Sequence, residues 1–136
     1  MQMNYYEKDK LLIFKIMEEI DEFSVKELRR KADYEIERFM PREVIFDFDC
    51  VTFMDSAGIG MIIGRYKQVG IIGGVTEVTN LSNSVRRIFR MSGMLKIIPE
   101  IDLNERLKNI ESKENSEEVI NLWEIKLQIM IWNWSL

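Results

Sequence analysis

Residues 43–65 read EVIFDFDCVTFMDSAGIGMIIGR, and this stretch decides the fold class. Its first part, residues 43–49, alternates apolar and polar side chains well enough to be a β-strand. After FMDSAG the pattern changes, and isoleucines recur at helical spacing over residues 59–63. A strand that passes directly into a helix is typical of an α/β fold. Ser56 lies at the junction between the two.

The segments before this stretch predict a hairpin and a helix. Residues 4–7 and 11–17 are aromatic and β-branched runs separated by a short polar segment, as in a β-hairpin. Apolar residues then recur every three or four positions over residues 25–39, which predicts an amphipathic helix. Ser24 precedes that helix with Glu27 three residues later, the pattern of a capping box.

The segments after it continue the alternation. Residues 74–80 are a β-branched run that predicts a strand, and residues 82–91 have helical periodicity. KIIPE, residues 96–100, predicts a short last strand, and residues 103–110 one or two final helical turns. We therefore expect a small mixed sheet of four to five strands covered by about four helices.

The composition excludes several classes of function. The net charge of -4 comes with Lys and Arg interleaved with Asp and Glu, so a nucleic-acid partner is not expected. The chain has no histidine, which removes the usual general base and the commonest zinc ligand. It also lacks a glycine-rich phosphate loop. We expect a protein that is not an enzyme, with no catalytic residue, no metal site and no cofactor of its own.

Cysteine usage and the first residues point to the cytoplasm. Cys50 is the only cysteine and cannot form an internal disulfide. Residues 1–10 lack the apolar stretch of a secretory signal. We therefore expect the reducing cytosol as the compartment.

Ser56 has two interpretations from its local sequence. Asp and Ser are both preferred helix N-caps, a role that stabilises a helix by about 1 kcal/mol. The alternative is that Ser56 is a site at which the protein is modified. The neighbouring residues alone do not decide between the two.

A family resemblance favours the second interpretation. FMDSAGIGMIIGRYKQV resembles the signature of the STAS-domain anti-anti-sigma factors, and most of all the sporulation antagonists of the anti-sigma F factor. The resemblance extends through EEIDEFSVKELRRK before it and SVRRIFRMSGMLKII after it. We take residues 1–112 as the STAS domain, whose known fold of a sheet with helices matches the pattern above.

The resemblance implies a switch between two partners. In this family the unphosphorylated protein binds an anti-sigma factor that is also a serine kinase, which frees a sigma factor for sporulation transcription. The kinase uses ATP to phosphorylate the serine, here Ser56, and a PP2C-type phosphatase reverses the change. Asp21, in the acidic turn EID, is implied as a partner contact, although Glu18 stands where the family favours glycine. The implied partner-binding residues are Asp21, Asp55, Ser56, Ala57, Gly58 and Ile59.

Three alternatives stay open at this point. The same domain could serve another partner-switching pathway, such as stress signalling. A nucleotide-hydrolysing enzyme is a further alternative, which would require turnover by the isolated protein. Arg86, Arg87 and Arg90 could form a phosphate-binding patch, but at this spacing they are more typical of the solvated face of a helix.

Residues 113–136 have no counterpart in the family pattern. A charge run at 111–118 suggests a solvated linker, and all three tryptophans of the chain follow it. Charged and polar residues interrupt the apolar ones, so we expect no membrane span. We consider two explanations for this atypical tail: a disordered appendage, or a shifted reading frame. One back-translation of MIWNWSL, read two nucleotides later, gives Asp-Met-Glu-Leu-Glu-Phe, which resembles the start of the partner kinase usually encoded next.

Overall fold

The computed structural model describes residues 1–134, with side chains described at 1–113 and 123–134. The chain divides into two units, one formed by residues 1–102 and one that begins at residue 103.

The first unit is built on one four-stranded sheet with the order β1-β2-β3-β4. β1 (Gln2–Tyr6) and β2 (Leu11–Lys15) form the predicted antiparallel hairpin. β3 (Glu43–Asp47) pairs with β2 in parallel, and β4 (Val75–Thr79) pairs with β3 in parallel. Each parallel step requires a crossover, and a helix supplies it in both cases. The predicted mixed sheet is confirmed.

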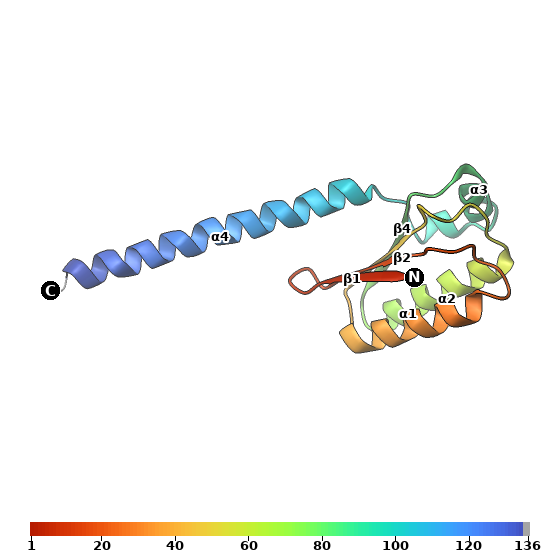
Figure 1. Cartoon of the computed structure of the whole chain (residues 1–136), viewed down its shortest axis with the longest axis horizontal. Helices are drawn as coiled ribbons and strands as arrows, with labels where there is room; N and C mark the ends of the chain where they lie inside the picture. The colour runs from red at the N-terminus through yellow and green to blue at the C-terminus, as the bar shows by residue number, and fades with distance from the viewer. Residues whose placement is uncertain (135–136) are drawn as a thin grey trace. The chain divides into compact units, whose positions relative to one another are not determined.

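Two of the helices cover one face of this sheet. α1 (Val25–Phe39) and α2 (Ser56–Ile71) lie side by side against it, and α3 (Asn83–Met91) follows β4 (Figure 1). Alternate strand positions point into the shared core because side chains alternate along a strand. The buried strand residues of that core are Leu12, Phe14, Val44, Phe46 and Val78, and the helices add Leu28, Ala32, Ile36, Met61, Ile62, Val69, Val85 and Phe89.

The strand predicted at residues 96–100 is wrong. The chain instead forms a short 3-10 helix, η1 (Met94–Lys96), and only Glu100 makes an isolated parallel bridge, to Val78 of β4. Gly93, with φ of 76°, adopts the left-handed conformation that suits glycine and turns the chain into η1. The isoleucines in KIIPE suggested a strand, but this turn leaves too little extended chain to form one.

The predicted capping box at the start of α1 is also wrong. Ser24 has helical backbone angles and makes no capping hydrogen bond. Its hydroxyl instead accepts from the Asp21 amide at 3.0 Å and donates to the Glu19 carbonyl at 2.7 Å. Glu27 forms an ion pair with Arg30 one turn later. The preceding turn, and not the helix, therefore uses the Ser24 hydroxyl.

The second unit contains α4 (Leu103–Trp134). The helix continues through the charge run that the sequence predicted as a linker, which is reasonable because Glu and Lys are good helix formers. Beyond that run, large apolar side chains on all sides of the helix are exposed: Trp123, Ile125, Leu127, Ile129, Met130, Ile131, Trp132 and Trp134. Within the described residues, no helix combines the length and apolar character needed to span a membrane. The predicted domain boundary at residue 112 falls within α4.

Candidate functional site

Ser56 is the first residue of α2, and its side chain is exposed. Asp55 fills the N-cap position with extended backbone angles, and its carboxylate accepts from the Ala57 amide at 2.8 Å. Ser56 therefore does not cap the helix, because Asp55 already does. The Ser56 hydroxyl makes no hydrogen bond to any other residue that the structure describes. It is left facing solvent at the positive end of the helix dipole.

Backbone hydrogen bonds join the loop that carries Ser56 to the loop between β2 and α1. Ile20 and Met54 form an isolated parallel bridge. The Ile20 amide donates to the Phe53 carbonyl at 3.2 Å, and the Asp55 amide donates to the Ile20 carbonyl at 3.1 Å. Both Ile20 and Met54 are almost fully buried, so the bridge is continuous with the core. The backbone on the N-terminal side of Ser56 is thus held by strand-like hydrogen bonds.

Glu19 secures the same loop through its side chain. One carboxylate oxygen accepts from the Thr52 hydroxyl at 2.9 Å and the Thr52 amide at 3.3 Å, and the other accepts from the Phe53 amide. Ser84, on α3, donates to the Thr52 carbonyl at 3.0 Å. The sequence places Glu19 in the acidic turn EID, but the family resemblance implied a partner contact only for Asp21 and no structural role for Glu19. Contacts between residues more than 30 positions apart left no signal in one sequence.

Asp21 uses its carboxylate within its own turn. It accepts from the Ser24 amide at 2.8 Å and from the Phe23 amide at 2.9 Å. The Ser24 amide is the main cause that holds the pKa of Asp21 below its ordinary value. The turn thus forms with Glu18 in the place of the family's glycine. Although acids gather here, no group of three or more His, Cys, Asp or Glu side chains in the described part could hold a metal ion.

The next three predicted residues lie at different depths. Gly58 is buried under the loop, where a Cβ atom would lie 2.3 Å from Cγ of Met54 and 3.0 Å from Cγ2 of Ile20. Ala57 and Ile59 are partly buried and pack against the core. Gly58 therefore shapes the loop from beneath, and only part of Ile59 is available to a partner.

A hollow beside Ser56 is lined by residues of α2 and of the end of α3. It has a volume of about 420 Å³ and is lined by Asp55, Ser56, Ile59, Ile88, Met91 and Ser92. Met91 is 79% exposed and adds apolar surface to the lining of this hollow. The helical periodicity predicted over residues 82–91 did not identify Ile88, Met91 or Ser92 as part of a hollow. The apolar residues of that helix spread beyond one face, and this was the signal that could have identified the hollow.

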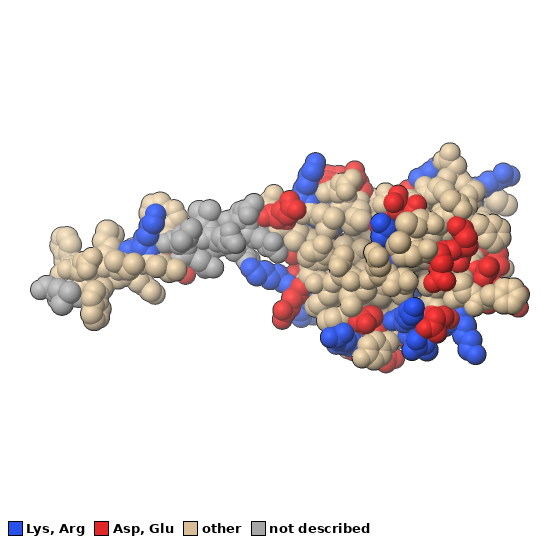
Figure 2. All heavy atoms as spheres, in the orientation of Figure 1, with Lys and Arg blue, Asp and Glu red and all other residues tan. Residues whose placement is uncertain are grey.

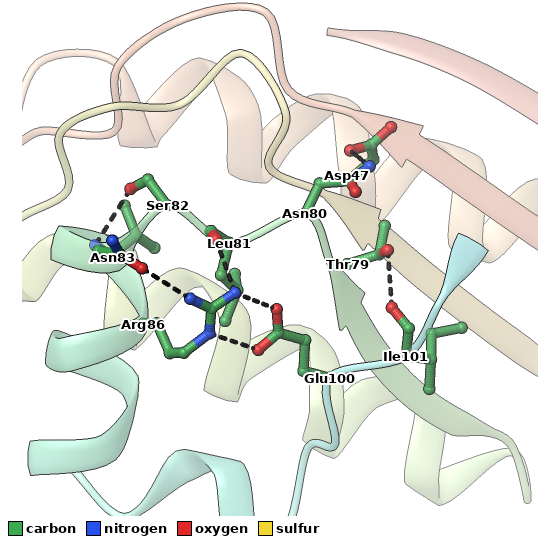
Figure 3. A network of polar contacts seen from close by, with 10 residues as sticks. Asp47, Thr79, Asn80, Leu81, Ser82, Asn83, Arg86, Glu100 and Ile101 are labelled. Atoms are coloured by element: carbon green, nitrogen blue, oxygen red, sulfur yellow. Dashed lines mark hydrogen bonds and ion pairs between the residues drawn. The ribbon is translucent and has the colours of Figure 1, made fainter. Parts of the chain in front are cut away.

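An ion pair fixes the position of α3 (Figure 3). Nε and Nη2 of Arg86 donate to the two carboxylate oxygens of Glu100 at 2.8 and 2.7 Å, and Nη2 also donates to the Leu81 carbonyl at 2.9 Å. The hydrogen bonds from Arg86 lower the pKa of Glu100. Arg86 is therefore neither part of the solvated face nor free for phosphate, whereas Arg87 and Arg90 are exposed.

Comparisons with known proteins agree with this fold. A chain named anti-sigma F factor antagonist, from Paenibacillus polymyxa, is 34% identical over 92 residues, which cover 68% of this chain and 79% of the relative. Two solved structures of SpoIIAA are also similar. The unphosphorylated form has a TM-score of 0.68 and 24% identity, covering 82% of this chain and 96% of the other. The phosphorylated form has a TM-score of 0.62 and 24% identity, covering 80% and 97%. The STAS domain model matches residues 2–110, and the chain therefore belongs to the STAS domain family.

Proposed function

We propose that this protein is an anti-sigma factor antagonist, whose binding to an anti-sigma serine kinase is ended by phosphorylation of Ser56. The observation that carries the proposal is the free, exposed hydroxyl on the first residue of α2, at the edge of an apolar hollow. The name of the Paenibacillus relative supports the antagonist role. A phosphorylated form is known for the structurally similar SpoIIAA. The kinase would supply the ATP chemistry, and a PP2C-type phosphatase in the same cytoplasm would remove the phosphate.

The fold tolerates the added charge. A phosphate carries about -1.5 to -2 charges near neutral pH. The N-terminus of α2 carries the positive end of the helix dipole, which favours an anion there. The Asp55 carboxylate already accepts from the Ala57 amide, so the phosphate would be placed beside a carboxylate.

The same charge should weaken the binding of a partner. The hollow presents Ile59, Ile88 and Met91, which a complementary apolar surface would cover. Covering it would strip water from the phosphate next to Asp55. A penalty of about 3 kcal/mol weakens binding roughly a hundredfold. Phosphorylation therefore acts on the complex without unfolding the domain.

The test is to incubate the purified protein with an anti-sigma kinase and ATP, and to follow intact mass and binding together. We expect one phosphate, located on Ser56, and loss of binding. Ser56→Ala should remain unmodified and bound, and Ser56→Asp should bind at least about tenfold more weakly. Ser92→Ala is the matched control, because Ser92 is a second serine in the same hollow. Phosphate on Ser92, or equal binding by Ser56→Asp, contradicts the proposal.

A further inference from the structure

The outer edge of β4 is paired over part of its length. β4 is the last strand of the sheet, and the chain that follows η1 lies beside it in parallel. The Val78 amide donates to the Pro99 carbonyl at 3.0 Å, and the Ile101 amide donates to the Val78 carbonyl at 2.9 Å. The next rung of this ladder would need an amide hydrogen from residue 99 for the Thr76 carbonyl. Proline has no amide hydrogen, so the ladder stops before Thr76.

Thr76 keeps polar groups that no described residue pairs. The Val75 amide donates to the Arg42 carbonyl and the Thr79 carbonyl accepts from the Phe48 amide, so the backbone groups of Val75 and Thr79 face β3. Successive residues of a strand face opposite edges, which turns the Thr76 amide and carbonyl outward. The Thr76 hydroxyl makes no hydrogen bond within the described part of the chain. Thr76 is only 2% exposed, and buried polar groups are normally paired.

A second hollow, here called the edge pocket, lies at this point. It has a volume of about 470 Å³, within the range of ligand-binding pockets. Thr76 lines it together with Tyr66 and Gly70 of α2 and with the half-exposed Ile97. Tyr66 and Gly70 come ten and fourteen residues after Ser56, which corresponds to about 15–21 Å along a helix. The edge pocket is therefore separate from the hollow beside Ser56.

The neighbouring chain is held in its register beside β4 (Figure 3). The Thr79 hydroxyl donates to the Ile101 carbonyl at 2.8 Å. Arg86 donates to both carboxylate oxygens of Glu100 at 2.8 and 2.7 Å. These contacts keep the segment from sliding along β4 to cover Thr76. Another chain is needed to complete the missing rung.

The edge pocket favours a neutral occupant with both a donor and an acceptor. Its lining includes Lys67 and Glu77, one charge of each sign. The face of the first unit that Figure 2 shows also carries both signs. Thr76 offers an amide donor and a carbonyl acceptor at the same edge, and an extended peptide backbone matches that pair.

We propose that the edge pocket binds an extended peptide, which adds to β4 at Thr76 as a short further strand. Main-chain hydrogen bonds supply the affinity in this mode of recognition, and a pocket for one side chain supplies the selectivity. The apolar parts of Tyr66, Ile97 and Pro99 suit an apolar side chain of the peptide. The Thr76 hydroxyl gains a partner from the same peptide. The site is independent of Ser56 and of its modification.

The test titrates the isotopically labelled full-length protein with the blocked pentapeptide acetyl-Thr-Val-Thr-Val-Thr-amide at millimolar concentration and follows backbone amides by NMR. We expect saturable shifts at Thr76 and Gly70 and none at Ser56. The Thr76 amide should move downfield because it gains an acceptor. The same peptide with every backbone nitrogen methylated keeps its side chains and loses its donors, so it should bind about tenfold more weakly.

Two glycines of α2 provide a matched pair of variants. A Cβ atom would meet nothing within 4 Å at Gly70 or at Gly64, so the fold should accept leucine at either position. Gly70→Leu should fill the edge pocket and abolish peptide binding. Gly64→Leu should bind as the wild type does, because Gly64 does not line the pocket.

Thr76→Val separates the hydroxyl from the shape of the side chain. It should raise the unfolding midpoint of the peptide-free protein, because it removes a buried hydroxyl that lacks a partner. It should also weaken peptide binding about three- to tenfold. A lowered midpoint with unchanged peptide binding contradicts the role given to the hydroxyl.

The wild-type protein alone is sufficient to overturn the proposal. Absence of saturable shifts, or equal binding of the methylated and unmethylated peptides, excludes strand addition at Thr76. Equal binding by Gly70→Leu and Gly64→Leu excludes the edge pocket. None of these results bears on the Ser56 switch, which the kinase assay tests by itself.

Discussion

Gly58 lies under the loop that carries Ser56 and has no room for a side chain, so Gly58→Ala should destabilise the protein. A Cβ atom there would lie 2.3 Å from Cγ and 2.6 Å from Sδ of Met54, and 3.0 Å from Cγ2 of Ile20. Carbon atoms in contact normally stay about 3.5–4.0 Å apart. Met54 would have to move by about 1 Å, yet it is 1% exposed and Ile20 is fully buried. Both side chains belong to the buried core, so any movement disturbs their packing.

The net effect is a balance of two terms. Overpacking a buried site costs about 1–3 kcal/mol, and the collision with two buried neighbours places this site near the upper end. Replacing glycine by alanine in a helix returns up to about 1 kcal/mol. We expect a net loss of about 1–2 kcal/mol, which lowers the melting temperature by roughly 4–8 °C in a chain of this size.

Gly60→Ala provides the matched control in the same helix. A Cβ atom at Gly60 would have no neighbour within 4 Å, so only the helix-propensity term remains. This variant should be more stable than the wild type by about 0.5–1 kcal/mol. Urea and thermal unfolding, followed by circular dichroism, measure both variants. A Gly58→Ala protein that unfolds at or above the wild-type midpoint would refute the packing argument.

Three further predictions follow from other parts of the molecule. Arg86 lowers the pKa of Glu100 below its ordinary value of 4.5, so their ion pair stabilises the fold above that pH and the stabilisation is lost as the pH falls through the lowered pKa. Glu100→Gln should thus lose about 1 kcal/mol at pH 7 and nothing measurable at the acid end of a pH series of unfolding curves. Glu19→Ala should speed amide hydrogen exchange at Thr52 and Phe53 about tenfold, Glu19→Gln should restore part of the protection, and equal exchange in all three proteins would exclude the carboxylate as the clamp. Deletion of residues 113–136 should leave the unfolding midpoint within about 2 °C and reduce light scattering, because that segment exposes apolar surface. Sequencing of the gene decides the shifted-frame hypothesis, which an intact frame shared by close relatives would contradict.

The sequence predicted the features that arise from local periodicity. The change from strand to helix period around FMDSAG located Ser56 at the start of α2, and the alternation of elements predicted the mixed sheet. These predictions succeed because one buried face imposes its period on each element. The error at residues 96–100 arose where β-branched side chains and a glycine turn gave opposite indications, and the turn prevailed.

The site itself was predicted only in part. Neighbouring residues predict that the Ser56 hydroxyl lies at the start of α2. They do not predict that Glu19 holds the preceding loop, because Glu19 contacts Thr52 from a distant part of the sequence. Ser24 was assigned to a cap because its spacing to Glu27 fits one, whereas in the fold its hydroxyl accepts from the Asp21 amide and donates to the Glu19 carbonyl. The hollow depends on how α2 and α3 pack, which the helical period of each alone does not specify.

The bridge between Ile20 and Met54 sets a condition on any enzyme that would modify Ser56. A kinase that grips its substrate as an extended segment would have to break the backbone hydrogen bonds of Ile20 and unwind the first turn of α2. An enzyme whose surface matches the folded domain faces no such cost. Under the proposed function, these backbone hydrogen bonds would make the exposed Ser56 hydroxyl a poor substrate for kinases that bind extended segments, and the choice of kinase would depend on the folded surface and not on a linear recognition motif.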